Sequence, residues 1–279
     1  MFTLNCNGKL LMASHPLVMG IINVTPDSFY EASRLPNAHP GKVDTIVRKA
    51  EQLLADGADI IDIGAQSTRP HSELVSEEDE LKRLDGLFYA MNRYFPDAVF
   101  SVDTFYSRVA QVSVSAGASM INDISGGKMD DSMILTAGKL PVPYVCMHSK
   151  GTPQTMQQYL NYENLVREIL DFFIVKMEEC RLAGIKDVII DPGFGFSKNI
   201  DQNFELLKNL EAFKILGRPL MAGLSRKSTV YKTLGLTAEE ALNGTTVMNT
   251  IALIKGADIL RVHDVKEAKE CIKLTGKIA

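Results

Sequence analysis

The sequence of 279 residues predicts an α/β fold, namely a single-domain (β/α)₈ or TIM barrel with a short β-hairpin at its N-terminus. Two observations predict this fold. Apolar runs of strand length alternate with amphipathic helical segments along the whole chain, and about eight such units fit a barrel of this length. Most of these runs also end in a polar residue, as barrel strands do where they meet a site at their carboxyl ends. A doubly wound open sheet is the alternative, because alternation alone does not show that a sheet closes.

The first elements separate a short N-terminal segment from the barrel. Residues 2–11 place apolar residues on both sides of Asn7-Gly8, a dipeptide typical of a hairpin turn, and we expect this hairpin to form a lid or plug. Residues 1–16 are therefore assigned to the hairpin and lead-in, and residues 17–279 to the barrel. The first barrel strand ends at Asn23, and a helical pattern over residues 43–54 stops at Gly57.

The same alternation continues to the C-terminus. Amphipathic helical segments are expected around residues 81–88 and over residues 107–116, with further helices between the later strands. Tight turns from helix to strand require a residue that ends the helix, and four glycines stand just ahead of a strand: Gly57, Gly117, Gly184 and Gly256. The remaining strands are expected at residues 59–64, 98–103, 120–123, 144–148, 188–191, 220–223 and 259–263.

Composition and charge narrow the class of protein. Hydrophobic residues make up 46% of the chain and charged residues 23%, which is typical of a folded globular protein. The formal net charge of -4 argues against a broad positive surface, so we expect neither nucleic acid nor a membrane as a partner. Residues 10–22 are too short and too interrupted to span a bilayer and follow no basic leader, which favours the cytoplasm. Four well-separated cysteines are expected to be reduced and partly buried: Cys6, Cys146, Cys180 and Cys271.

Polar residues stand at or near the carboxyl ends of nearly all the predicted strands. Any one of them alone is more often structural, because an Asp at a strand end usually caps a helix and a lone His is usually a satisfied surface or core residue. Barrel strands converge on one mouth, however, so side chains at this level should face a common cavity. The set is Asn23, Asp62, Asp103, Asn122, His148, Asp191, Lys227, Arg261 and His263.

The chemistry of this set indicates a ligand with a heterocyclic end and an anionic end. Asp103, Asn122 and Asp191 present carboxylate and amide edges, which suit a flat ring rich in N–H donors such as a 2-amino-4-oxopyrimidine. Lys227 adds a donor for a ring oxygen or nitrogen. The donors of a second group suit a pyrophosphate, and Asn23 could help to hold its magnesium; the donors are Arg261, His263, Thr68 and Arg69.

Two glycine-containing segments look like nucleotide-binding motifs and are not. Residues 193–196 contain a G-x-G, but the segment follows Asp191-Pro192 and lacks the third glycine of a dinucleotide loop. Residues 223–228 end like a P-loop, but Arg226 stands where the second glycine is required.

Several longer motifs, in the same order, resemble those of the dihydropteroate synthase family of pterin-binding barrels. The resemblance runs through nearly the whole chain. It rests on Asn23-Val24-Thr25-Pro26-Asp27-Ser28-Phe29, Asp62-Ile63-Gly64, Ser67-Thr68-Arg69-Pro70, Ser101-Val102-Asp103-Thr104, Ile121-Asn122-Asp123, residues 191–196, Ser225-Arg226-Lys227-Ser228 and Arg261-Val262-His263-Asp264.

The resemblance implies a reaction and a role for each matching residue. Such enzymes displace diphosphate from (7,8-dihydropterin-6-yl)methyl diphosphate with the amine of 4-aminobenzoate, use Mg²⁺, and form homodimers. The residues that would hold the pterin are Asp103, Asn122, Asp191, Lys227 and Met147. Those that would hold the diphosphate are Thr68, Asn23, Arg261 and His263, with Asn23 also on the metal. Those near 4-aminobenzoate would be Thr68, Arg69, Pro70, Phe196 and Ser228, and Asp27, Ser28 and Phe29 would lie on a loop that closes over the site.

The sequence departs from the family pattern in both loops. Family members usually continue the first loop with Ser-Asp-Gly-Gly, where this chain has Tyr30-Glu31-Ala32-Ser33, and they read Gly-Gly-Glu before Ser-Thr-Arg-Pro, where it has Gly64-Ala65-Gln66. Fewer glycines should stiffen or reshape these loops. Two alternatives therefore stay open, a catalytically silent pterin-binding paralogue and a methyltetrahydrofolate-dependent corrinoid methyltransferase.

Overall fold

A computed structural model describes residues 1–24, 42–66 and 74–278 of the chain. Eight parallel strands form one sheet in the order β8-β7-β6-β5-β4-β3-β10-β9. The edge strands β8 and β9 meet through a parallel bridge between Ile190 and Leu220, and the Ile190 N–H donates to the Pro219 carbonyl at 3.0 Å. The sheet therefore closes into the predicted barrel, and the open-sheet alternative is wrong. The strands are β3 (Leu17–Asn23), β4 (Ile60–Gly64), β5 (Val99–Asp103), β6 (Met120–Asp123), β7 (Tyr144–Met147), β8 (Val188–Asp191), β9 (Met221–Ala222) and β10 (Ile259–Val262).

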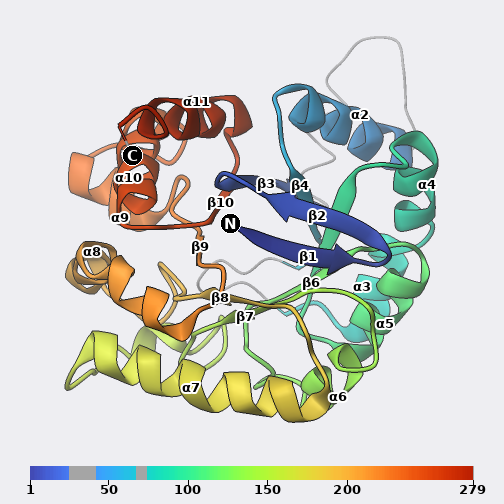
Figure 1. Cartoon of the computed structure of the whole chain (residues 1–279), viewed down its shortest axis with the longest axis horizontal. Coiled ribbons are helices and arrows are strands. Elements are labelled where there is room, and N and C mark those ends of the chain that lie inside the picture. The colour runs from blue at the N-terminus through green and yellow to red at the C-terminus, as the bar shows by residue number, and fades with distance from the viewer. Residues whose placement is uncertain (25–41, 67–73, 279) are drawn as a thin grey trace.

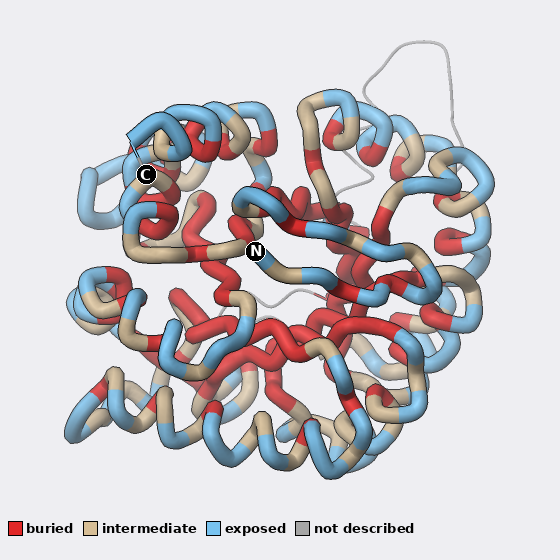
Figure 2. Tube along the Cα trace, in the orientation of Figure 1, coloured by how far each residue is buried: buried red, intermediate tan, exposed pale blue. Residues whose placement is uncertain are grey.

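Helices surround this barrel (Figure 1). Their apolar faces cover the outer face of the strands and their polar faces are exposed, so the buried strands form the inner ring of the molecule (Figure 2). The α-helices are α2 (Lys42–Ala55), α3 (Glu77–Leu84), α4 (Leu87–Tyr94), α5 (Ser107–Ser115), α6 (Met133–Ala137), α7 (Leu165–Ala183), α8 (Ile200–Lys208), α9 (Ser228–Leu234), α10 (Leu242–Ile254) and α11 (Val265–Thr275). Two 3₁₀ helices, η1 (Met156–Gln158) and η2 (Leu210–Leu216), lie between the later elements.

The structure differs from the predicted elements in two respects. The amphipathic segment around residues 81–88 is two helices, α3 and α4, because Gly86 between them takes a left-handed conformation with φ of 68°. Several strands are also shorter than their apolar runs, and β9 has two residues where four were predicted. An apolar run predicts which residues are buried, whereas the first and last residues of a strand depend on hydrogen bonds to the neighbouring strand.

The N-terminal hairpin closes one end of the barrel. Strands β1 (Phe2–Cys6) and β2 (Lys9–Ala13) pair in antiparallel fashion across Asn7 and Gly8, whose φ angles of 55° and 86° fit a tight hairpin turn. Leu4, Cys6 and Ala13 are buried against residues in the amino-terminal halves of the barrel strands, including Met19 and Ile60. The hairpin is thus a plug at the amino ends of the strands, which leaves the carboxyl ends available for a site.

Two other sequence predictions can be compared with the structure. All four cysteines are free and buried, more completely than expected. Among the described residues, no helix is both long enough and apolar enough to cross a membrane.

Candidate active site

Buried polar side chains gather at the carboxyl ends of adjacent barrel strands. Asp103 on β5 pairs in register with Asn122 on β6, and Met147 on β7 pairs with Asp191 on β8. Paired residues of neighbouring parallel strands point to the same side of the sheet. Asp103, Asn122 and Asp191 are each at least nine-tenths buried, so their carboxylate and amide groups lie within the barrel end rather than on its rim.

One cluster joins three strands through a single carboxylate oxygen and a fourth strand through Arg261. Asp62 Oδ2 on β4 accepts from Arg261 Nε at 2.7 Å and from Asn122 Nδ2 at 2.8 Å, and it lies 2.6 Å from Arg261 Nη2. The same Nη2 donates to Asp103 Oδ2 at 2.7 Å. The guanidinium of Arg261 therefore bridges two carboxylates, and the amide of Asn122 is oriented by the hydrogen bond that its N–H donates to Asp62.

The environment of Asp103 makes its carboxyl easier to protonate. Burial raises the pKa of Asp103 to about 7; the charge of Arg261 lowers it, and the charge of Asp62 raises it. Gly64, its register partner on β4, leaves room for this side chain, because a Cβ at Gly64 would stand 3.2 Å from Asp103 Oδ2. Asp103 is thus a buried acceptor that titrates near neutral pH.

A second cluster is built on the loop after β8. Asp191 Oδ1 accepts from the Gly193 N–H at 2.8 Å, and Lys227 Nζ donates to the Phe194 carbonyl. Gly193 has φ of 74°, and a Cβ there would stand 2.0 Å from the His148 carbonyl, so only glycine fits this turn. Burial raises the pKa of Asp191 and lowers that of Lys227 to about 8, while each charge favours the ionised form of the other.

These two clusters form one site. A Cβ at Gly223, just after β9, would stand 3.7 Å from Lys227 Nζ and 3.9 Å from Arg261 Cβ, so these two side chains lie on either side of the same residue. The positive charge of Arg261 accordingly lowers the pKa of Asp191 and that of Lys227. The Lys227 ammonium is 5.0 Å from the centre of the Phe196 ring. Met147, Phe105 and Ile124 form a small buried apolar cluster, and Phe196 packs against it. Carboxylates, an amide and an ammonium thus stand beside apolar surface, an arrangement suited to a flat polar ring.

Donors for an anion stand near Lys227 and Arg261. The Ser225 Oγ lies 3.0 Å from His263 Nδ1 and accepts from the His263 N–H at 3.2 Å. Desolvation and the charge of Arg261 lower the pKa of His263, and although His263 is an exposed residue its ring is neutral at pH 7 and offers an N–H. Ser228 is the first residue of α9, and Asn23, the last residue of β3, is exposed.

Comparison with known proteins agrees with this geometry. The sequence matches the family model described as "Pterin binding enzyme" over residues 19–263. A dihydropteroate synthase of Clostridium beijerinckii is 40% identical over 261 residues, which cover 92% of both chains. The dihydropteroate synthase of Escherichia coli K12 is 39% identical over 96% of this chain and 93% of its own. The chain belongs to the dihydropteroate synthase family.

Solved structures of the dihydropteroate synthase family share the whole fold. A Xanthomonas albilineans dihydropteroate synthase with 4-aminobenzoic acid aligns with a TM-score of 0.91 and 34% identity, covering 99% of this chain and 97% of that one. Another from the same organism, in complex with 7,8-dihydropteroate, aligns with a TM-score of 0.85 and 31% identity, covering 99% of this chain and 98% of that one. The family makes this chain an enzyme, a transferase of the dihydropteroate synthase type.

Six of the residues predicted from the family motifs lie outside the described residues: Asp27, Ser28, Phe29, Thr68, Arg69 and Pro70. On either side of the second loop, Gln66 and Val75 are joined by hydrogen bonds. Gln66 Nε2 donates to the Val75 carbonyl at 2.8 Å and to Glu80 Oε2 at 2.7 Å, and Gln66 Oε1 accepts from the Val75 N–H at 3.0 Å. Dihydropteroate synthases usually carry Glu in place of Gln66, and a carboxylate could not make these two donations.

The site contains a residue that sequence reasoning missed. Lys198 is 3% exposed, and its Nζ lies 3.2 Å from His148 Nδ1. The same Nζ donates to the carbonyls of Gly193 and Phe196, each at 3.0 Å. A lysine in a polar turn is usually exposed, so the sequence did not predict that Lys198 would be buried in the site. His148, predicted as a strand-end residue, packs its ring edge against Phe172, with centroids 5.0 Å apart, and is 2% exposed.

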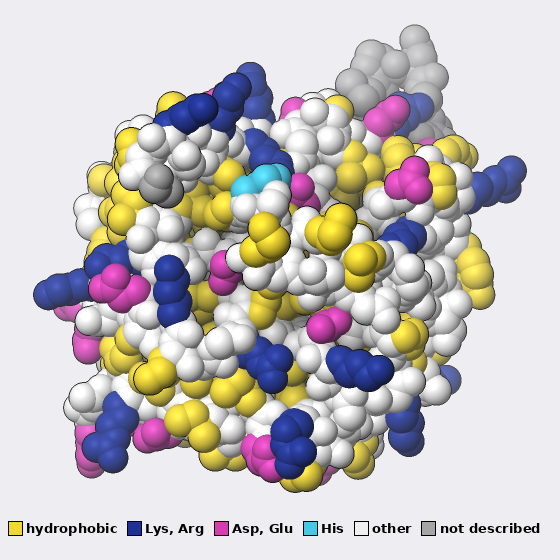
Figure 3. All heavy atoms as spheres, in the orientation of Figure 1, with side chains coloured by type: hydrophobic (Ala, Val, Ile, Leu, Met, Phe, Trp, Pro, Cys, Tyr) yellow, Lys and Arg dark blue, Asp and Glu magenta, His cyan; other side chains and the backbone are white. Residues whose placement is uncertain are grey.

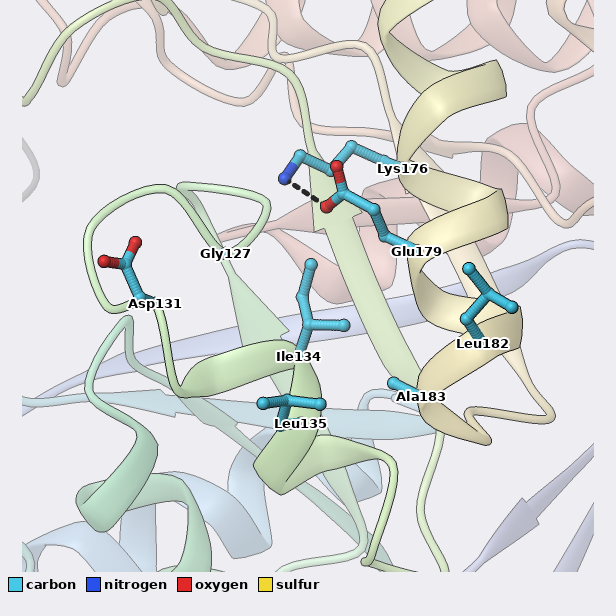
Figure 4. A pocket seen from close by; sticks show the side chains of 8 residues that line it. All are labelled: Gly127, Asp131, Ile134, Leu135, Lys176, Glu179, Leu182 and Ala183. Carbon is cyan, nitrogen blue, oxygen red and sulfur yellow. Dashed lines mark hydrogen bonds and ion pairs between the residues drawn. The ribbon is translucent and has the colours of Figure 1, made fainter.

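A surface hollow of about 420 Å³ lies elsewhere, between α6 and α7 (Figure 4). Ile134 and Leu135 line it from α6, and Lys176, Glu179 and others line it from α7. Lys176 Nζ and Glu179 Oε2 are paired at 2.6 Å, as the dashed line in Figure 4 marks. None of the predicted site residues lines this hollow, so we do not assign substrate binding to it.

Proposed function

We propose that the carboxyl end of this barrel binds (7,8-dihydropterin-6-yl)methyl diphosphate and condenses it with 4-aminobenzoate, giving 7,8-dihydropteroate and diphosphate. The observation that carries the proposal is the meeting of Asp62, Asp103, Asn122 and Arg261 in one hydrogen-bonded cluster beside Asp191 and Lys227. The relatives bearing the dihydropteroate synthase name cover nearly the whole chain, which favours this function over a corrinoid methyltransferase.

In this proposal each end of the site has a task. Asp191 and Asp103 accept N–H donors of the pterin ring, Asn122 presents its remaining amide edge, and Lys227 donates to a ring acceptor. Met147 lies against the ring on its apolar side. Phe196 and Ser228 lie near 4-aminobenzoate, together with Thr68, Arg69 and Pro70 of the second loop. The buried setting supports these roles, because hydrogen bonds to charged groups are stronger where water is excluded.

The diphosphate end consists of Arg261, His263 and Thr68, with Asn23 at the metal. Among the described residues no group of three acidic, His or Cys side chains could by itself hold a metal ion. Mg²⁺ is commonly bound by few protein oxygens together with substrate phosphates and waters. The single oxygen of Asn23, exposed at the end of β3, fits such an ion when it arrives with the diphosphate. When bound, Mg²⁺ would neutralise charge on the leaving group.

The proposed mechanism needs no strong base. The aryl amine of 4-aminobenzoate is neutral at pH 7, and the pterin ring can carry the positive charge of the methylene carbon as its bond to diphosphate breaks. The protein then positions the two reactants, stabilises the departing negative charge through Arg261 and His263, and excludes water. Asp191 lies beside the ring, where its carboxylate form would stabilise positive charge.

Binding of the pterin diphosphate is expected to be strongest between about pH 7 and pH 8. The pKa of Asp103 is raised to about 7, so its accepting carboxylate is lost as the pH falls through that value. The pKa of Lys227 is lowered to about 8, so its third donor and charge are lost as the pH rises through that value. Calorimetric titration from pH 5.5 to 9.5 checks this expectation, and a dissociation constant that stays flat across the range would contradict it.

Turnover separates the proposed function from its alternatives. Calorimetry with the pterin diphosphate is followed by a diphosphate-release assay with 4-aminobenzoate, with and without Mg²⁺. The proposal predicts binding, metal-dependent release and formation of dihydropteroate. Binding without release would instead identify a silent paralogue, whose altered loops no longer support chemistry.

We also infer that the protein is a homodimer. Helix α10 is apolar on its outward side as well as its inward side, since Val247, Ile251 and Ile254 are 51%, 37% and 60% exposed. These positions lie at spacings of four and three residues, so they form one stripe, and a second copy is the occupant that the family implies. Sedimentation should give a dimer for the wild type and a monomer for Ile251→Glu, while Leu182→Glu on α7 stays dimeric. A monomeric wild type at micromolar concentration would refute this assembly.

The proposed setting is the cytoplasm, with small-molecule substrates as partners and neither nucleic acid nor membrane. Free buried thiols support a reducing compartment. On the face seen in Figure 3 the basic and acidic side chains are interspersed, without a broad basic surface. Within this proposal residues 17–279 form the pterin-binding unit, and residues 1–16 serve as its plug.

A further inference from the structure

We propose that Lys198 is a positioning residue of the pterin site, whose ammonium holds the loop after β8 in the shape that orients Asp191 and Lys227. The inference rests on the proposed function, because it concerns the same pocket. Lys198 belongs to none of the motifs that carried the family resemblance, and its buried ammonium contacts two backbone carbonyls and the His148 ring. It acts through the loop rather than on the ligand.

The contacts of the Lys198 ammonium account for all three of its N–H donors. Its three acceptors are the Gly193 carbonyl, the Phe196 carbonyl and His148 Nδ1, at 3.0, 3.0 and 3.2 Å. An ammonium is the only side-chain group that offers three donors from one atom. The two carbonyls stand three residues apart, so the ammonium spans the turn from inside and ties it to the residue after β7.

The atoms that Lys198 fixes are neighbours of those that orient the proposed binding groups. The Gly193 N–H donates to Asp191 Oδ1 at 2.8 Å, while the Gly193 carbonyl accepts from Lys198. The Phe194 carbonyl, one residue on, accepts from Lys227 Nζ. Asn203 Oδ1 accepts from the Gly195 N–H at 2.7 Å and holds the outer side of the same turn. A displaced turn would therefore misplace both the carboxylate and the ammonium that face the pterin.

Lys198 also acts electrostatically on Asp191. Burial lowers the pKa of Lys198 to about 7, and the charge of Asp191 opposes that change. In return, the charge of Lys198 lowers the pKa of Asp191, together with Lys227 and Arg261. None of the ion pairs between described residues includes Lys198. The carboxylate that favours its charge is Asp191, on the other side of the turn and not in contact with it. A buried cation without such a contact is costly, which indicates a role beyond packing.

The test compares Lys198→Met with a matched neighbour, Lys150→Met. Lys150 also lies in this region, but its Nζ binds Glu168 and the Asn161 carbonyl and stands over the Tyr162 ring, outside the turn. The dissociation constant of the pterin diphosphate is measured from pH 5.5 to 8 for both variants and the wild type. Circular dichroism and a melting curve show whether each variant is folded, and Lys198→Gln serves as a second uncharged variant.

Lys198→Met is expected to raise the dissociation constant at least tenfold at pH 6.5, where Lys198 of the wild type carries its charge, and to move the acid midpoint of binding to higher pH. The midpoint moves upward because the pKa of Asp191 rises when a nearby positive charge is removed, so that protonation of Asp191 adds to that of Asp103 on the acid limb. The other charged or titratable groups that face Lys198, namely His148, Lys150 and Lys227, are retained in that variant. Lys150→Met should stay within twofold of the wild type with an unchanged midpoint.

Several results would overturn the inference. Wild-type affinity in Lys198→Met would do so, as would weaker binding with an unmoved midpoint, since that pattern indicates only a structural role. Failure of both Lys198→Met and Lys198→Gln to fold would likewise assign Lys198 to stability alone. A wild type that binds but does not turn over would count against the proposed function and leave the positioning role intact, whereas a wild type that does not bind would end both.

Discussion

Asp191→Asn is expected to weaken binding of the pterin diphosphate by on the order of a hundredfold while leaving the protein folded. The carboxylate can accept two parallel N–H donors of the ring, and an amide of the same shape can accept only on its oxygen. The amide nitrogen would face a ring donor and leave it unpaired. Each hydrogen bond to a charged group is worth about 1.5–3 kcal/mol. Losing one such bond and leaving a ring N–H unpaired therefore accounts for a loss of affinity of about a hundredfold.

The stability of Asp191→Asn should not fall with its affinity. Burial raises the pKa of Asp191, so its ionised form is less favourable in the folded protein than in the unfolded chain at neutral pH. A neutral amide avoids that cost. Calorimetry and urea unfolding measure the two quantities, with Asp187→Asn as the control because Asp187, before the start of β8, accepts from the Asn5 N–H at the plugged end of the barrel. An unchanged dissociation constant in Asp191→Asn would overturn its assignment to the pterin.

Asp62→Asn is expected to lower both stability and affinity. Asp62 Oδ2 accepts from Asn122 and Arg261 in a fully buried setting, so the substitution leaves the Arg261 guanidinium with Asp103 as its remaining carboxylate. Removing one partner of a buried ion pair costs roughly 3 kcal/mol. The amide oxygen of the variant can still accept from Asn122 but carries no full charge, so the bond that orients Asn122 is weaker and binding weakens with it.

The pH dependence of Asp62→Asn gives a more specific check. The charge of Asp62 raises the pKa of Asp103, so its removal should lower that pKa and move the acid limb of pterin binding to lower pH. Ser101→Ala is a suitable control because Ser101 pairs in register with Asp62, and its Oγ has no hydrogen-bond partner among the described residues. Wild-type stability in Asp62→Asn, or an acid limb that moves upward, would contradict this account of the cluster.

Much of the fold could be predicted from the sequence because the barrel repeats one local pattern. Each apolar run with a polar residue at its end marks a buried strand that reaches a loop, and this placed Asp103, Asn122 and Asp191 at one end of the sheet. The alternation alone did not show closure, which the number of units favoured and which the structure shows in the bridge between Ile190 and Leu220.

The contacts within the site were harder to predict than its members. Arg261 was expected at an anion, yet its guanidinium bridges Asp62 and Asp103, of which Asp62 lies 199 residues away. Local pattern does not specify a side-chain rotamer or a distant partner. The burial of Lys198 could not be predicted, because it depends on how the turn over residues 193–196 folds around the side chain.

The most direct test of the central claim is a crystal structure of the protein with the pterin diphosphate bound. The account predicts that the ring lies within hydrogen-bonding distance of Asp103, Asn122, Asp191 and Lys227, with the diphosphate toward Arg261 and His263. A ring bound outside the carboxyl end of the barrel, or one that leaves Asp191 and Asn122 without contact, would contradict it.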